Sequence, residues 1–138
     1  MSGRAGTVVD SSVLLDVFTE DERWLDWSEA ALRAALARGP LFLNAIVLAE
    51  IAPRFSRIEA LEAALPRRSI IEELPRAAAF LAGHAHADYR RAGGKRTQIF
   101  ADFLIASHAA ITGRPLLTRD PRRVSTYLPG VKLISPTA

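Results

Sequence analysis

The chain has 138 residues, of which 49% are hydrophobic and 24% are charged. This length suits one domain, residues 1–138, and the composition allows a buried core, which excludes global disorder. The chain has no cysteine, which excludes disulfides, thiolate metal sites and a cysteine nucleophile. The net charge of +3 and a pI near 9.9 favour polyanionic partners, although a genome rich in arginine codons would give the same bias.

Two classes of membrane or export signal are not found in the sequence. No run of about 18 apolar residues is present, so no transmembrane helix is expected. The start, MSGRAGTVVD, meets an aspartate too early to hold the apolar core of a secretory signal. We therefore expect a cytoplasmic protein that does not bind membranes.

Strands and helices alternate along the chain. Short apolar or β-branched runs bounded by turn residues predict strands, and apolar residues at helical spacing between capping and breaking residues predict helices. The first predicted strand is Thr7–Val9. A helix is predicted next, because Thr19 and Glu22 have the spacing of a capping box, and it is expected to end at Gly39 and Pro40. The remaining predictions, in order, are a strand at 41–43, a helix capped by Asn44 and ended by Pro53, a helix at 58–65, a strand at 69–71, helices at 75–91 and 100–112, and strands at 115–118 and 131–134.

This alternation predicts an α/β domain with a parallel sheet covered by helices on both faces. In such folds ligands bind in the crevice at the carboxyl ends of the strands. No repeat, linker or low-complexity segment divides the chain.

Asp10 and Glu50 are the first two candidate site residues. Asp10 directly follows the first predicted strand, which places it at the carboxyl edge of the sheet, but it could equally cap the next helix, unless Ser12 does so. Glu50 lies in a helix that is apolar on nearly every side, where a charged group needs a partner. Its alternative roles are a solvent-facing position or an ion pair with Arg54.

Asp102 and Asp120 complete the acidic set. Asp102 lies in the first turn of an apolar helix, where any acid benefits from the helix dipole. Asp120 precedes Pro121, an arrangement that is also typical of a helix cap. Local spacing does not establish that the four acids meet. If they do, oxygen-only ligation suits hard cations such as Mg²⁺, with Mn²⁺ as a substitute.

The ordered set of fragments resembles the PIN-domain ribonucleases and, within them, the VapC-type toxins of bacterial toxin–antitoxin pairs. The resemblance spans nearly the whole chain and rests on TVVDSSVLLD, LFLNAIVLAEI, FADFLIASHA and LLTRDPRRV. Residues 55–97 match no motif of the family, and Val124 stands where the family often has an aromatic residue.

The resemblance implies a single PIN-like domain with a central parallel sheet of four to five strands flanked by helices. It implies that Asp10, Glu50, Asp102 and Asp120 are the catalytic and metal-binding residues of a Mg²⁺-dependent endoribonuclease. Ser12 and Thr118 would lie beside these acids, and Asp16 is a further candidate near the pocket unless it is a solvated helix acid. The implied partners are RNA, an antitoxin protein encoded adjacently and a second copy of the chain.

The chemistry expected of such a site is hydrolysis by water. One or two metal ions would polarise the phosphodiester and lower the pKa of a bound water, leaving a 5′-phosphate and a 3′-hydroxyl. Arg119, Arg122 and Arg123 flank Asp120 and would contact the RNA backbone.

Several alternatives stay open at the level of sequence. The chain could be a PIN-type nuclease without an antitoxin, or a binding module of the same fold that has lost catalysis. An aspartyl phosphotransferase is disfavoured, because the DSS sequence lacks a second aspartate two residues after Asp10. Trp24 and Trp27 share a helix face and would pack in the core, or else line an apolar groove for an antitoxin or a dimer partner. His84, His86 and His108 are expected to be structural or exposed.

Overall fold

The computed structural model describes residues 6–136, so the first five and last two residues of the predicted 1–138 domain lie outside the described residues. Residues 1–5, in which a secretory signal would begin, are among them. The described elements follow the predicted alternation, but two of the helices, Ser11–Phe18 and Arg122–Ser125, were not among the predicted helix ranges. In chain order they are β1 Thr7–Val9, α1 Ser11–Phe18, α2 Leu25–Arg38, β2 Leu41–Leu43, α3 Ala45–Ile51, a 3₁₀ turn Ala52–Arg54, α4 Ile58–Ala64, β3 Ser69–Ile71, α5 Arg76–Arg91, α6 Ile99–Thr112, β4 Leu116–Leu117, α7 Arg122–Ser125 and β5 Leu133–Ile134.

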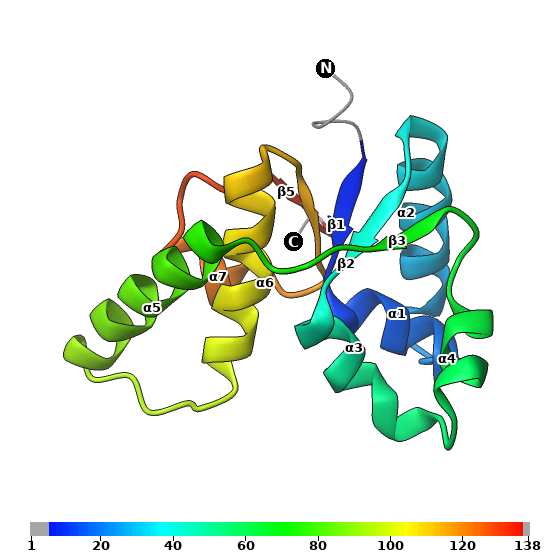
Figure 1. The fold of residues 1–138 in the computed structure, drawn as a ribbon, viewed down its shortest axis with the longest axis horizontal. Coiled ribbons are helices and arrows are strands. Elements are labelled where there is room, and N and C mark those ends of the chain that lie inside the picture. Colours follow the sequence, from blue (N-terminus) through cyan, green and yellow to red (C-terminus); the bar gives the residue numbers. More distant parts are fainter. Residues whose placement is uncertain (1–5, 137–138) are drawn as a thin grey trace.

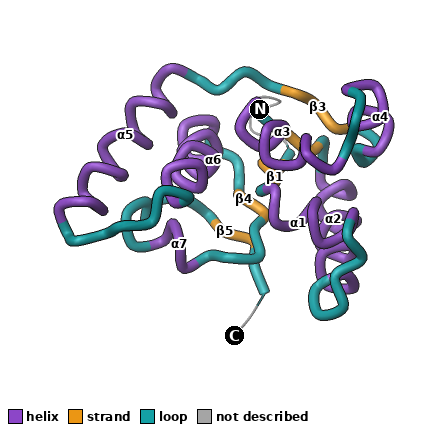
Figure 2. Tube along the Cα trace, turned by 90° about the horizontal axis from the view of Figure 1, so that it is seen from below, coloured by secondary structure: helices purple, strands orange, loops and turns teal. Residues whose placement is uncertain are grey.

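The strands form one parallel sheet in the order β3-β2-β1-β4-β5, which confirms the predicted fold class. Helices α5, α6 and α7 lie on one side of this sheet and α1 and α2 on the other (Figure 1; Figure 2). The strand order reverses at β1, which has β2 on one side and β4 on the other. In open parallel sheets, this switch point is where a crevice opens between the loops that leave the strands.

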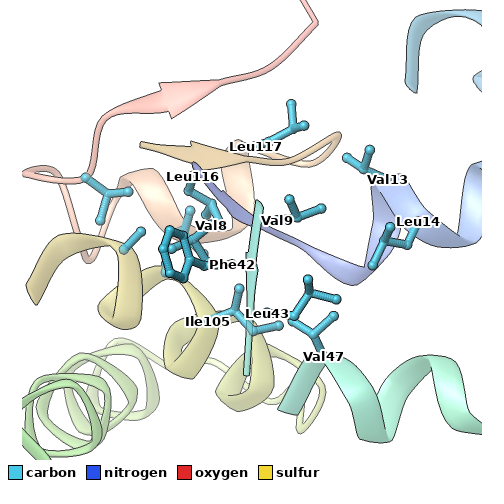
Figure 3. Close-up of a cluster of buried hydrophobic side chains, with 14 of the residues drawn as sticks. Val8, Val9, Val13, Leu14, Phe42, Leu43, Val47, Ile105, Leu116 and Leu117 are labelled. Carbon is cyan, nitrogen blue, oxygen red and sulfur yellow. The ribbon is translucent and has the colours of Figure 1, made fainter. Parts of the chain in front are cut away.

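The core is formed by strand residues that alternate between the two helical layers. Val8, Phe42 and Leu116 are aligned across the sheet and face Ile105 of α6, whereas Val9 and its neighbour Leu117 face α1 (Figure 3). All of these side chains are buried. The strands contain only two or three residues each, and every residue of the three central strands, β2, β1 and β4, is buried.

The ends of the helices confirm one of the predicted capping signals and contradict another. Asn44 caps α3 as predicted, because its side-chain oxygen accepts hydrogen bonds from the backbone N–H groups of Ile46 and Val47. The predicted capping box of Thr19 and Glu22 is wrong. The Thr19 hydroxyl instead donates to the carbonyl of Leu15 within α1.

Asp21 stabilises the turn between α1 and α2. Its carboxylate accepts hydrogen bonds from the backbone N–H groups of Arg23 and Trp24. As a result, α2 starts only at Leu25.

Among the described residues, no helix combines the length and apolar character needed to cross a bilayer.

Candidate active site

A row of polar side chains follows the strands at the carboxyl edge of the sheet. Asp10, Asn44, Glu72 and Thr118 come directly after β1, β2, β3 and β4. Each stands two residues beyond an aligned strand residue that faces α6, so all four belong to the α6 face of the sheet. We call these residues the polar row.

Asp10 is the most buried of the four predicted acids, with an exposed fraction of 9%. It occupies the N-cap position of α1, but its side chain makes no capping hydrogen bond. The carboxylate instead accepts hydrogen bonds from the hydroxyls of Ser12 (2.7 Å) and Thr118 (2.8 Å). Burial raises the pKa of Asp10, and the charge of Asp120 adds to this, while the two hydroxyls oppose it.

Glu50 lies near the end of α3 and reaches toward α1 and the start of α6. It accepts hydrogen bonds from the Ser11 hydroxyl (2.6 Å) and from Nε2 of Gln98 (3.0 Å), rather than pairing with Arg54. Partial burial is the main cause of a raised pKa for Glu50, and the nearby charge of Asp10 adds to it. Sequence reasoning missed Ser11 and Gln98; the position of Ser11 next to Asp10 was the only available signal.

Asp102 lies in the first turn of α6, as expected, and its side chain is 12% exposed. Its nearest cationic partner is Nη1 of Arg123, 3.5 Å from Oδ2. Burial raises the pKa of Asp102 to about 7, and the charges of Asp10 and Glu50 contribute, while Arg123 opposes them. At neutral pH this carboxyl is therefore poised between its charged and neutral forms.

Asp120 lies at the edge of the site and is half-buried. Its backbone N–H donates to the Thr118 hydroxyl (3.1 Å), and its carboxylate lies 3.9 Å from Nη1 of Arg119. The alternative role as a helix cap is not observed, because α7 begins at Arg122 with Pro121 in the cap position.

The four acids line one cavity of about 370 Å³, which we call the acidic cavity. Ser11, Ser12, Gln98, Arg119 and Arg123 also contribute to its walls. The carboxylates come from β1, α3, α6 and the loop after β4, so the fold brings together residues that are far apart in the sequence.

The donor set fits a hard divalent cation in its chemistry. Every candidate ligand is a carboxylate oxygen, and three of the four carboxyls have raised pKa values, which a bound cation would lower. Within residues 6–136, however, no three acidic or histidine side chains already stand close enough to hold an ion between them.

Three further residues that were predicted near the acids, Arg119, Arg122 and Asp16, differ from one another in burial and in contacts. Arg119 donates from Nε to Asp16 (2.9 Å), whereas Arg122 is exposed. Asp16 is 2% exposed and also accepts from Ser28, so it is neither a solvated helix acid nor part of the cavity wall. It holds Arg119 in place.

Asn44 and Glu72, the polar-row residues that follow β2 and β3, form a hydrogen-bonded network with His108 and Arg114. His108 of α6 is fully buried, and its ring nitrogens lie 2.9 Å from Nδ2 of Asn44 and 2.6 Å from Oε1 of Glu72. Since the Asn44 oxygen caps α3, its amide donates to Nδ1 of His108, and His108 donates from Nε2 to Glu72. Arg114 also donates to Glu72 (2.7 Å). Burial alone would raise the pKa of Glu72, but these two partners outweigh it and lower the pKa.

Comparisons with known proteins agree with this architecture. The sequence profile of the PIN domain matches residues 7–126. A search of curated protein sequences found no match. Similar solved structures include a chain of VapBC2 from Rickettsia felis bound to a promoter DNA fragment, with 18% identity, a TM-score of 0.71 and coverage of 95% of this chain and 98% of that one.

Two further solved structures have the same fold. A chain of DNA-bound VapBC from Salmonella typhimurium has 17% identity, a TM-score of 0.69 and coverage of 95% and 98% of the two chains. A chain of a toxin–antitoxin complex from Klebsiella pneumoniae has 18% identity, a TM-score of 0.64 and coverage of 96% and 98%. With its profile match, its parallel sheet and its acidic cavity at the switch point, the chain belongs to the PIN domain family.

Proposed function

We propose that the protein is a divalent-metal-dependent endoribonuclease and the toxin of a toxin–antitoxin pair. The observation that carries this proposal is the convergence of Asp10, Glu50, Asp102 and Asp120 on one cavity, with raised pKa values for three of them. A protein that merely needed a stable fold would gain nothing from placing carboxylates where they repel one another.

Asp10, Glu50, Asp102 and Asp120 would hold Mg²⁺ or Mn²⁺. When bound, a divalent cation offsets the carboxylate charges, polarises a phosphodiester and makes water a stronger nucleophile. The protein's own residues would prepare the site. Ser12 and Thr118 fix the orientation of Asp10, and Ser11 and Gln98 fix that of Glu50.

Arg119 and Arg123 line the same cavity and would bind the phosphate whose bond is cut. Their guanidinium groups would also offset the negative charge that develops on the phosphate. We expect water to attack the phosphorus and the 3′-oxygen to leave, which gives a 5′-phosphate and a 3′-hydroxyl.

The proposed partner is an antitoxin encoded beside the toxin. This proposal draws on the fold shared with chains of VapBC complexes and of a toxin–antitoxin complex. We further propose that the protein acts in the cytoplasm, where its RNA substrate is found, and that it forms a homodimer. A short reading frame next to the gene, whose product relieves growth arrest caused by the toxin, would support the pairing.

The test of the nuclease activity uses purified protein and single-stranded RNA. Cleavage should require Mg²⁺ or Mn²⁺, stop with EDTA and be lost in Asp102→Asn. Asp88→Asn is the matched control, because Asp88 is an exposed acid on α5 whose only ion-pair partner within residues 6–136 is Arg91. Cleavage that survives both EDTA and Asp102→Asn would reject the proposal.

A further inference from the structure

A second pocket, of about 430 Å³, adjoins the acidic cavity. The two hollows share Arg119, Asp120 and Arg123 in their walls. The second pocket is also lined by Trp24 and three more arginines from separate parts of the chain, Arg23, Arg96 and Arg122. We call it the arginine pocket.

The arginine pocket carries positive charge that the described part of the chain does not balance. Arg119 and Arg123 form ion pairs with acids of the site. Arg23, Arg96 and Arg122 are exposed and make no ion pair within residues 6–136. Guanidinium groups that line a hollow without acidic partners suit a ligand with several phosphates.

Trp24 gives this pocket an aromatic surface. The two tryptophans of this segment differ: Trp27 packs against the hydrophobic core, whereas Trp24 is half-buried and lies outside it. The Trp27 ring is nearly perpendicular to the Trp24 ring, at 6.5 Å between centroids and 84° between planes, so the two rings do not stack face to face. The expectation of core packing is therefore confirmed for Trp27 only.

The groups that now lie over the Trp24 ring are guanidinium groups. Cζ of Arg23 is 4.9 Å and Cζ of Arg119 is 5.6 Å from its centroid. Arg119 is fixed by Asp16, but Arg23 is exposed and has no acidic partner among the described residues. A nucleobase could therefore replace Arg23 on the ring and leave its guanidinium group to bind the adjoining phosphate.

We propose that the arginine pocket binds a nucleotide of single-stranded RNA that neighbours the one in the acidic cavity. The base stacks on Trp24, and Arg23, Arg96 and Arg122 bind its phosphates. This inference rests on the proposed nuclease function and adds to it a preference for unpaired RNA, because a base in a duplex cannot leave its neighbours to stack on a side chain at no cost.

The pairing of an aromatic face with unbalanced arginines favours RNA over an acidic protein segment. The carboxylates of an acidic peptide would use the guanidinium groups but would bring no aromatic ring to stack on Trp24. Stacking of a base on an aromatic side chain stabilises the complex whatever the base, because every base has a planar face. Loss of the ring should therefore weaken RNA binding by about tenfold, which corresponds to about 1.4 kcal/mol.

The test measures RNA binding without divalent metal, in EDTA, so that cleavage does not interfere. In a Trp27→Phe background the fluorescence reports on Trp24 alone, since the chain has two tryptophans. Oligoadenylate should quench this fluorescence, and an abasic ribose-phosphate oligomer of equal length should bind without quenching. With Trp27 intact, Trp24→Leu should bind labelled oligoadenylate about tenfold more weakly, and Trp24→Phe should restore most of the affinity because it keeps an aromatic ring.

Equal affinity of wild type and Trp24→Leu for oligoadenylate, with both variants folded by circular dichroism, would overturn the inference. Quenching by polyglutamate but not by oligoadenylate would also overturn it and would assign the pocket to an acidic protein. Quenching by oligoadenylate in a protein that never cleaves RNA would reject the nuclease function while leaving the RNA site standing. Metal-dependent cleavage with an unchanged KM in Trp24→Leu would reject this site alone.

Discussion

Helix α6 contributes one ionisable side chain to each half of the polar row. Asp102 lies beside the residues that follow β1 and β4, and His108 lies between those that follow β2 and β3. In the His108 half, each acceptor has a donor, and the pKa of Glu72 is lowered. In the Asp102 half, acids face acids, and their pKa values are raised.

The two halves therefore lie at the same edge of the sheet but have opposite effects on the stability of the fold. A network whose members satisfy one another stabilises the folded chain. A group of carboxylates held close together destabilises it until a cation binds. This difference supports the proposal that the Asp102 half binds the metal ion, and the following changes test that proposal.

The largest difference should be seen in catalysis, when the same substitution is made in each half. Glu50→Gln should lower kcat/KM for RNA by more than about 100-fold, because the substituted side chain belongs to the proposed metal-binding set. Glu72→Gln should change kcat/KM by less than about threefold, when both are assayed at a temperature where both variants are folded. Equal losses in the two variants would remove the functional distinction between the halves.

The next largest effect should be on stability in the His108 half. His108→Ala should lower the free energy of unfolding by about 3 kcal/mol, because it leaves a cavity and removes the partners of Asn44 and Glu72. Urea denaturation measures this value. His84→Ala, at an exposed position on α5, is the control and should change it by less than about 0.5 kcal/mol. A small loss for His108→Ala would mean that the network is not cooperative.

Glu72→Gln should cost about 1–3 kcal/mol of stability near pH 7, since Arg114 and His108 lose a charged acceptor. The pKa of Glu72 is lowered in the folded state, so its contribution is present above the ordinary glutamate pKa and disappears as the pH falls through the folded value. Denaturation of both proteins from pH 7 to pH 3 should show the two stabilities converge. A difference that persists at pH 3 would assign the effect to packing.

The smallest effect, and one of opposite sign, is expected for Asp102→Asn without metal. The folded pKa of Asp102 is raised to about 7, so its charge destabilises the folded state above that pH, and the cost vanishes as the pH falls toward the unfolded value. At pH 8 in EDTA the variant should be about 1–2 kcal/mol more stable than wild type. Added Mn²⁺ should stabilise wild type but not the variant. A variant that is less stable than wild type at pH 8 would contradict the destabilisation of the fold by the burial of this charge and by its acidic neighbours.

Local sequence determined the order and type of most elements, because strand propensity and helix-capping signals act over a few residues. The boundaries moved by only a few residues: the predicted strands at 115–118 and 131–134 shortened to Leu116–Leu117 and Leu133–Ile134, and the predicted helix at 100–112 begins at Ile99. The Thr19–Glu22 error arose because a threonine hydroxyl can end one helix as readily as begin the next.

The sequence also named the four acids, through Glu50 in an apolar helix and through the resemblance of four ordered segments to one family. It could not decide whether Asp10 and Asp120 were helix caps, because capping and ligand positions have the same local sequence. Only the tertiary structure brought Asp10, Glu50, Asp102 and Asp120 to one cavity, placed Ser11 and Gln98 in its wall and placed Trp24 in the adjoining arginine pocket. The physical reason is that the register and order of parallel strands, which are set by long-range pairing, decide which strand ends meet.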